Sequence, residues 1–218
     1  MSGPAAIGAI PELAFGIEAA EAVDPAAVPT LRFLVRVDAG GADVRSLALN
    51  VQLRIDAQRR AYDASERERL AEIFGDASQW RAGLRSLLWT QLAVTVPPFH
   101  GSTLADLTVP LTFDFDVVAA KYLYAVEAGE VPLSFLFSGT LFSAAPDGRL
   151  QATRIPWDCE ADYRLPVGVW RAAVDRAFPN AAWLRLDRDV FERLRAYRSA
   201  AALPSWDATI ARLLEGAP

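Results

Sequence analysis

The fold is decided by residues 31–55, which read LRFLVRVDAGGADVRSLALNVQLRI. Apolar residues alternate with polar ones on both sides of the Gly40-Gly41 pair: Leu31, Phe33, Val35 and Val37 before it, and Leu47, Leu49, Val51, Leu53 and Ile55 after it. A period of two is typical of a strand with one buried and one wet face. A Gly-Gly pair supplies the backbone angles of a tight turn. The sequence therefore predicts a β-hairpin with its turn at Gly40-Gly41.

Further elements are expected on both sides of this hairpin. Strand patterns occupy residues 13–17, 90–96, 109–117, 131–142 and 150–155. A helix is expected after Ser65, which forms a capping box with Glu68, and others after Ser78 and over residues 118–128. From about residue 160 the pattern becomes helical, with Pro166 in a first turn and with Asp187 and Ser205 as caps.

Runs of strands, rather than strict alternation of strands and helices, predict an α+β fold. We expect a twisted antiparallel sheet of about six to seven strands, with inserted helices and a helical C-terminal region packed on it. Residues 1–12 are expected to form a flexible arm because they are small and rich in Gly and Pro. Residues 13–160 should form the β-rich core, and residues 161–218 the helical region of the same domain.

Charge and cysteine content limit the classes of function. The 22 basic and 27 acidic residues give a net charge of −5, which disfavours nucleic acids and anionic membranes as partners. The one cysteine, Cys159, excludes an intrachain disulfide. The N-terminus lacks the pattern of a signal peptide, and the apolar runs are too short to cross a bilayer. These features predict a cytoplasmic protein.

Motifs for cofactors, metals and nucleophilic catalysis are missing. No glycine-rich loop of the P-loop or dinucleotide type occurs, and no Gly-x-Ser-x-Gly elbow. One histidine and one cysteine cannot assemble a typical nitrogen and sulfur metal site. We therefore expect no cofactor and no transition metal.

His100, Asp114 and Asp116 are the weak catalytic candidates. His100 lies in a segment expected to be a loop, where a histidine can serve as a general base. Asp114 and Asp116 share one face of an expected strand, so their carboxylates lie about 7 Å apart. The alternative for these residues is an ordinary solvated loop and strand face. Cys159, beside Asp158 and Glu160, is expected to be inert, and Lys121 to reach out to water.

Tryptophan and arginine recur in the last third of the chain. Both types are enriched at binding hot spots, and the candidate binding residues are Trp157, Asp158, Arg164, Trp183 and Arg185. The alternative is that the tryptophans fasten helices to the sheet. Helical spacing points Trp170 and Trp206 inward, whereas Trp157 and Trp183 lie in short connections and are expected to be exposed.

Several segments carry a resemblance to a known family: YRLPVGVWR (163–171), FPNAAWLRL (178–186), IPWD (155–158), LLWTQLAVTVPPF (87–99) and AAKYLYAVEAGEVPLSFLFSGTLF (119–142). They resemble an uncharacterised bacterial family, a domain of unknown function, from about residue 13 onward. The resemblance implies a gene neighbourhood near NiFe hydrogenase genes in high-GC bacteria, and no functional residues. A second similarity, to export chaperones of the SecB type, rests on the N-terminal amphipathic strands alone.

Three functions follow from these observations. The first is a non-catalytic protein-binding or assembly accessory protein for an unidentified protein partner, which the resemblance connects with a hydrogenase or other redox complex. The second is a small hydrolase-like or other enzyme that uses His100 with Asp114 and Asp116. The third is a peptide-binding chaperone. The oligomeric state has no signature in the sequence.

Overall fold

The structure is a computed structural model of the chain. It describes residues 11–24, 26, 28–80, 84–111, 117–145, 148–177, 179 and 184–216. Most of the expected arm therefore lies outside the described residues. The chain divides into two compact units, Met1–Ala182 and Trp183–Pro218, and each is described by itself.

The first unit is organised around one long strand, β2 (Thr30–Ile55). Gly40 and Gly41 have positive φ angles of 58° and 86°, yet the strand continues through them. The Gly40 N–H donates to Asp38 Oδ1 at 2.9 Å, and the register with the neighbouring strand shifts between Asp38 and Asp43. The expected hairpin is therefore wrong. The glycines form an irregularity within one strand, because positive φ angles serve a bulge as well as a turn.

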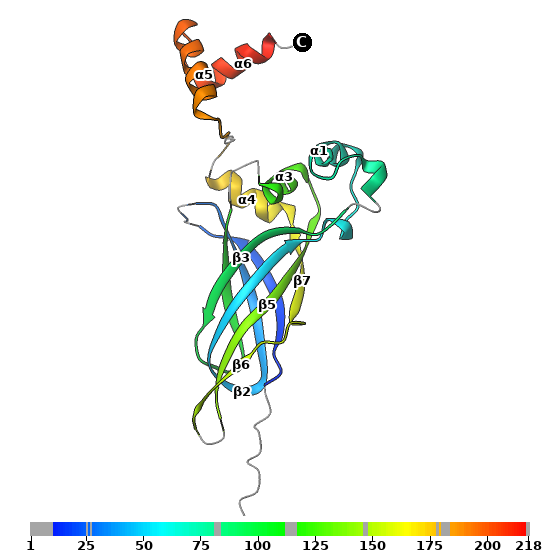
Figure 1. Ribbon diagram of the computed structural model, residues 1–218, viewed down its shortest axis with the longest axis vertical. Coiled ribbons are helices and arrows are strands. Elements are labelled where there is room, and N and C mark those ends of the chain that lie inside the picture. The colour runs from blue at the N-terminus through cyan, green and yellow to red at the C-terminus, as the bar shows by residue number, and fades with distance from the viewer. Residues whose placement is uncertain are drawn as a thin grey trace, which may run out of the picture. The chain divides into compact units, whose positions relative to one another are not determined.

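The two halves of β2 have different neighbours. On one edge, β4 (Phe99–Pro110) pairs with the N-terminal half and β3 (Leu87–Val96) with the C-terminal half. On the other edge, β1 (Ala14–Ala22) pairs with the N-terminal half and β5 (Glu130–Ala144) with the C-terminal half. The free edge of β5 is covered by β7 (Glu160–Pro166) and β6 (Leu150–Arg154). The result is a seven-stranded antiparallel, curled sheet (Figure 1).

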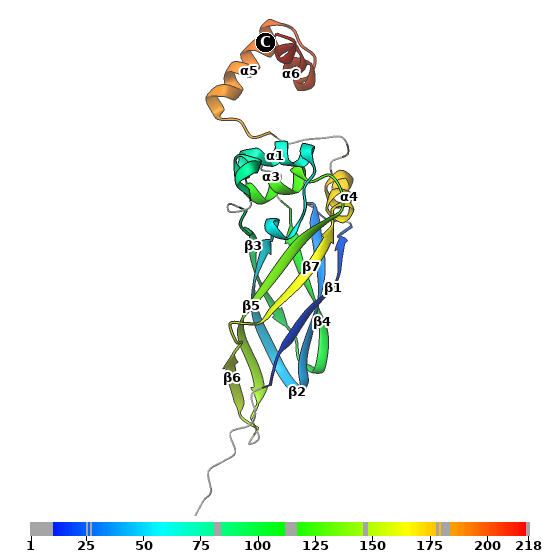
Figure 2. The same cartoon turned by 90° about the vertical axis from the view of Figure 1, so that its right-hand side faces the viewer.

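The helices of the first unit gather at one end of the sheet in both views (Figures 1 and 2). Those with described bounds are α1 (Ala64–Phe74), α3 (Val118–Ala125) and α4 (Val167–Ala177), with short 3-10 turns at Ala57–Arg59 and Ala77–Gln79. The capping box of α1 is made by Asp63 and Glu66, not by the predicted Ser65 and Glu68. After Ser78 the 3-10 turn ends, Trp80 is helical, and the Leu84 N–H donates to the Trp80 carbonyl oxygen at 3.0 Å, as in the helix expected there; residues 81–83 lie outside the described ranges. The α+β class with inserted helices is confirmed.

Two further predictions of secondary structure need correction. His100 lies in β4 rather than in a loop. Strand β4 runs through Pro110 and so includes the first two residues of the strand expected at residues 109–117, of which residues 112–116 lie outside the described residues. Strand β7 occupies residues 160–166, where a helix was expected, and Pro166 ends that strand. Ala161 and Leu165 are buried while Asp162 and Arg164 are exposed. This alternation is that of a strand that pairs with β5 on one edge.

The core fills the inner face of the sheet. Its fully buried members come mainly from β2 and β5, namely Leu31, Phe33, Leu47, Leu53, Ile55, Leu133, Phe135, Phe137 and Leu141. Phe33 makes edge-to-face contact with Phe135 at 5.2 Å between ring centroids. Fully burying such side chains contributes about 1.5–3 kcal/mol each. The alternation in the sequence therefore correctly identified the inner face of both halves of β2.

The second unit is a helical hairpin of α5 (Arg188–Ala200) and α6 (Trp206–Glu215). Ser205 caps α6 as predicted, since its Oγ accepts from the Ala208 N–H at 3.1 Å. The Trp206 ring lies 5.3 Å from Phe191, and the Arg198 guanidinium lies 4.6 Å above the Trp206 ring. These contacts join the two helices. No helix in the described part of the chain is long and apolar enough to cross a membrane.

Candidate functional site

His100 is the catalytic candidate that the structure describes. Its Nδ1 lies 2.8 Å from Asp43 Oδ1, and the two side chains are 72% and 77% exposed. His100 stands near the start of β4, whereas the chain reaches Asp114 and Asp116 only after the opposite end of that strand. Both aspartates lie outside the described residues. The partner of His100 is thus Asp43, on open surface, and no pattern in the sequence indicated that pair.

Within the described ranges, no three side chains of His, Cys, Asp or Glu come together as a metal site would require. Cys159 is half-buried, and its Sγ lies 3.8 Å from the Leu13 carbonyl oxygen. Burial, and then the charge of Asp158, raises the pKa of the Cys159 thiol. A raised pKa leaves little thiolate, in agreement with the expected inertness. Lys121 reaches Glu72 on α1 and forms an ion pair with it.

The tryptophans divide as their local patterns predicted. Trp157, in the connection between β6 and β7, is 92% exposed. Trp170 on α4 is 5% exposed and makes edge-to-face contact with Tyr124 at 4.7 Å. Trp206 is half-buried in the helical hairpin. The exposure of Trp157 and the burial of Trp170 are therefore confirmed, and Trp183 lies outside the described residues.

Of the other candidate binding residues in the first unit, Asp158 directly follows Trp157 in the chain, whereas Arg164 lies farther along, in β7. Asp158 and Arg164 are exposed in the first unit, and Arg185 is exposed in the second. The loop of Trp157 faces Ser138 of β5, whereas Arg164 pairs with Pro132. Six strand residues separate these two positions on β5, which corresponds to about 20 Å. The binding role of the set stays a prediction.

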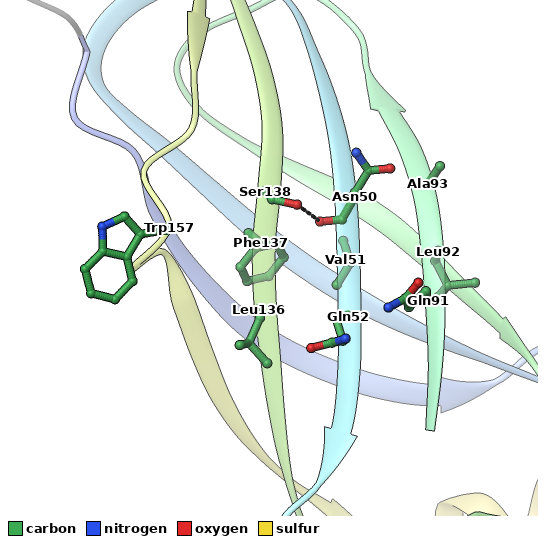
Figure 3. A pocket seen from close by; sticks show the side chains of 10 residues that line it. All are labelled: Asn50, Val51, Gln52, Gln91, Leu92, Ala93, Leu136, Phe137, Ser138 and Trp157. Carbon is green, nitrogen blue, oxygen red and sulfur yellow. Dashed lines mark hydrogen bonds between the residues drawn. The ribbon is translucent and has the colours of Figure 1, made fainter. Parts of the chain in front are cut away.

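A shallow depression of about 510 Å³ lies on the outer face of the sheet, beside Trp157 (Figure 3). Three strands form its floor. Asn50 of β2 pairs with Ala93 of β3 and Ser138 of β5, and Gln52 pairs with Gln91 and Leu136 in the next row. The lining residues are Asn50, Val51, Gln52, Gln91, Leu92, Ala93, Leu136, Phe137, Ser138 and Trp157, and none of them is ionisable.

The outer face around the N-terminal half of β2 has the opposite character. Arg32 forms ion pairs with Glu21 of β1 and, at 3.6 Å, with Asp106 of β4. Arg36 pairs with Glu18 of β1 at 2.6 Å. Exposed pairs of this kind contribute little to stability because water and salt screen them, so this face is an ordinary solvated surface. The neutral face beside Trp157 is the exception.

A polar network joins the end of β2 to β5 and β7. The Ser134 hydroxyl donates to the buried carboxylate of Asp56, and it also lies 3.1 Å from Asp162 Oδ1. Arg59 pairs with Asp162 at 2.7 Å and with Asp56 at 3.4 Å. The hydrogen bond from Arg59 lowers the pKa of Asp162. Sequence reasoning missed this network because its members are brought together only by strand pairing.

The helical hairpin carries an apolar surface, which we call the hairpin patch. Its exposed apolar side chains are Val190, Phe191, Tyr197, Ile210, Leu213 and Leu214, of which Leu214 is the most exposed at 68%. No described residue of α5 is buried, and Thr209 is the buried residue of α6. The helical stripes were predicted from the sequence, but their exposure was not, because a stripe is usually turned toward a core.

Comparisons with known proteins give a family. Residues 10–218 match the family described as "Family of unknown function (DUF6084)". A search of curated proteins returns no match.

Comparison with solved structures gives matches with low TM-scores. The CARDB domain of a Pyrococcus furiosus protein has 11% identity and a TM-score of 0.29, over 72% of this chain and 88% of that one. A putative late embryogenesis abundant protein has 12% identity and a TM-score of 0.32, over 72% and 73%. A β-glucosidase from Kluyveromyces marxianus has 10% identity and a TM-score of 0.26, over 71% and 15%. These likenesses support no functional argument.

Proposed function

Because the chain belongs to DUF6084, a family of unknown function, we propose its role from its own surfaces. The protein is a non-catalytic protein-binding or assembly accessory protein, and the hairpin patch is its docking surface. The partner class implied by the sequence resemblance is a hydrogenase or other redox complex in the cytoplasm.

The exposure of apolar side chains in the unit Trp183–Pro218 carries this proposal. Units shorter than about 40 residues rarely bury enough apolar surface to be stable without a metal, a disulfide or a binding partner. The described part of this unit holds neither a cysteine nor a histidine. Contact with another protein would remove Phe191, Ile210, Leu213 and Leu214 from water, which favours binding by about 25 cal/mol per Å² of apolar area.

The charges around the hairpin patch suit a specific rather than a purely hydrophobic contact. Arg195 pairs with Glu192 at 2.6 Å on the exposed side of α5, and Arg212 follows on α6. Protein interfaces combine an apolar centre with a polar rim, and arginine is enriched in them. Both helices of the hairpin carry charged residues of this kind beside exposed apolar ones, which supports the proposal.

A matched pair of leucine variants tests the proposal. The tagged full-length chain, Leu214→Asp and Leu150→Asp are each purified from the native host, and the retained proteins are quantified by mass spectrometry. Leu150 on β6 and Leu214 on α6 are both 68% exposed, so the two substitutions are equal in chemistry and exposure. We expect one set of proteins to be retained by the wild type and by Leu150→Asp and to be lost with Leu214→Asp.

Two results would contradict the proposal. One is a set of retained proteins that does not differ between the two variants. The other is a fall in melting temperature for Leu214→Asp alone while partner capture persists, since Leu214 would then stabilise the fold. Thermal unfolding of all three proteins is therefore measured beside the capture experiment.

A further inference from the structure

We propose that the neutral outer face formed by β3, β2 and β5 binds a neutral carbohydrate, with Trp157 as the platform on which a sugar ring stacks. We call this surface the Trp157 face; it consists of Asn50, Gln52, Gln91, Ala93, Leu136, Ser138 and Trp157. The proposal concerns the sheet of the first unit and does not depend on the hairpin patch.

The absence of ionisable residues from the lining of the depression favours an uncharged ligand over a charged one. Charged residues make up 22% of the chain, and the outer face around Arg32 and Arg36 is covered by ion pairs. None of the ten residues that line the depression is ionisable. A phosphate, a nucleotide or an acidic sugar would be recognised by arginine or lysine side chains, and the depression offers none. An uncharged ligand loses no ionic hydration there.

The floor of the depression offers side-chain amides. Asn50, Gln52 and Gln91 each present one carbonyl oxygen and one NH₂ group, which together accept and donate hydrogen bonds. No described residue forms a hydrogen bond with these three side chains, whereas Ser138 Oγ is 3.4 Å from the backbone oxygen of Asn50 (Figure 3). A sugar hydroxyl also donates and accepts at one atom. Rows of amides on adjacent strands therefore match a ring that carries several hydroxyl groups.

Trp157 adds an apolar plane at the β5 side of the depression (Figure 3). An indole that is 92% exposed is unusual for so large an apolar group, and such groups are enriched at binding sites. The loop that carries it is fixed at both ends. The Ile155 N–H donates to the Gly139 carbonyl oxygen at 3.1 Å, and the Phe137 N–H donates to the Cys159 oxygen at 2.9 Å. Only residues 156–158 lie between these two hydrogen bonds, so the backbone that carries the indole is anchored to β5.

The dimensions fit a short oligosaccharide. Three adjacent strands span about 10 Å from β5 to β3. The depression of about 510 Å³ falls within the usual range for small-molecule sites. Its floor combines side-chain amides with the apolar Ala93 and Leu136, and its edge is aromatic. This combination offers hydrogen bonds to the rim of a sugar ring and an apolar contact to the ring face. A charged peptide would find no ionisable partner among the lining residues.

The test uses the full-length chain and defined glycans. Maltohexaose, cellohexaose, mannohexaose and xylohexaose are titrated by isothermal calorimetry, with oligogalacturonate and heparin fragments as anionic controls. We expect at least one neutral glycan to bind and both anionic glycans to fail. Trp157→Ala and Gln52→Ala should each weaken that binding about tenfold or more, while Trp157→Phe, which keeps an aromatic plane, should retain most of it. Leu150→Ala and the hairpin variant Leu214→Asp should bind the glycan as the wild type does.

Several results would overturn the proposal. They are a failure of all four neutral glycans to bind at millimolar concentration, equal binding by wild type and Trp157→Ala, or a preference for the anionic glycans. Loss of captured proteins with Trp157→Ala would identify the Trp157 face as a protein-docking surface and would also overturn it. Loss of captured proteins with Leu214→Asp alone bears on the hairpin patch and not on the Trp157 face. The docking proposal and the carbohydrate proposal can therefore fail independently of each other.

Discussion

Gly139 on β5 lies so close to Ala48 on β2 that a Cβ atom at position 139 would stand 1.9 Å from the Ala48 carbonyl oxygen. Gly139 also has a φ of 142°, a conformation that side-chain-bearing residues rarely adopt. It pairs with Leu49 at the centre of the β2–β5 ladder and accepts the Ile155 N–H that fixes the Trp157 loop. One glycine thus holds two strands and the loop of Trp157 in place.

Gly139→Ala should therefore lower the free energy of unfolding by about 3 kcal/mol or more, since backbone strain and a clash with main-chain atoms add together. Gly168→Ala on α4 is the matched control, because no atom lies within 4 Å of its Cβ position. In a helix that change should be neutral or stabilise by about 0.5–1 kcal/mol. Urea unfolding of both variants measures the difference. Equal stability of the two would show that β5 and β2 are not in this register.

Adjacent residues of β2 test which face of the strand is buried. Val51 is 1% exposed on the inner face, and Gln52 is half-buried on the outer face. Val51→Asp should lower the free energy of unfolding by about 4 kcal/mol or prevent folding, because it buries an unpaired charge. Gln52→Asp should cost less than about 1 kcal/mol. Similar effects of the two substitutions, measured by urea unfolding, would contradict the face assignment.

The sequence predicts which face of a strand is buried better than it predicts which strands pair with each other. The alternation from Leu31 to Ile55 identified the buried side of β2 because burial depends on local periodicity. It could not tell a turn from an irregularity at Gly40-Gly41, since both use positive φ angles. That choice is made by the neighbouring strands. β3 and β4 run along one edge of β2 and β1 and β5 along the other, so its two halves have no edge on which to pair with each other.

For the Trp157 face, too, the sequence predicted which side chains are exposed but not which of them lie together. The exposure of Trp157 followed from its place beside Pro156 in a short connection, and Asn50 and Gln52 were visible as the wet side of a strand. Gln91 could not be joined to them, because its place opposite Gln52 depends on the register between two distant strands. For the hairpin patch, the sequence predicted which side chains lie together but not whether they are exposed. The stripes of α5 and α6 were read correctly, but a stripe does not reveal whether a core covers it.

A buried ion pair at the start of α1 should be sensitive to truncation. Glu66 is 3% exposed and accepts from Arg60 Nη2 at 2.7 Å and from the Glu127 N–H at 3.2 Å. Glu66→Ala removes the capping box and leaves the half-buried Arg60 without its carboxylate, at a cost of about 3–5 kcal/mol. Glu68→Ala, an exposed position of the same helix, should cost less than about 0.5 kcal/mol. Thermal unfolding compares them, and equal melting temperatures would contradict the burial of Glu66.

Asp162 should contribute to acid sensitivity. Its hydrogen bond with Arg59 lowers its pKa below the ordinary 3.8 on folding, so the native state binds fewer protons than the unfolded state. The stabilisation is complete above pH 3.8 and is lost as the pH falls through the lower, folded-state value. Asp162 is 56% exposed, so solvent screening limits the effect to less than about 1 kcal/mol. Asp162→Asn should flatten the pH dependence of stability below that pH, and wild type and variant should converge once the pH falls below the folded-state pKa of Asp162. Parallel curves would contradict the assignment.

Hydrogen exchange should separate the two units of the chain. The amides of β2 from Leu49 to Leu53 lie in a ladder with strands on both sides, and their exchange requires opening of the core. The α5 helix has no buried residue in the described chain. Amides of α5 and α6 should therefore exchange about a hundredfold faster than those of β2.

The same measurement bears on the docking role of the hairpin patch. A partner that binds Ile210, Leu213 and Leu214 must hold α6 closed, and contact with Phe191 must do the same for α5. Binding should therefore slow exchange in both helices and leave β2 unchanged, because the core of the first unit is already closed. Leu214→Asp should abolish this slowing, and Leu150→Asp should not. If α5 and α6 in the free chain are protected as strongly as β2, their apolar side chains are already covered, and no surface remains for a partner.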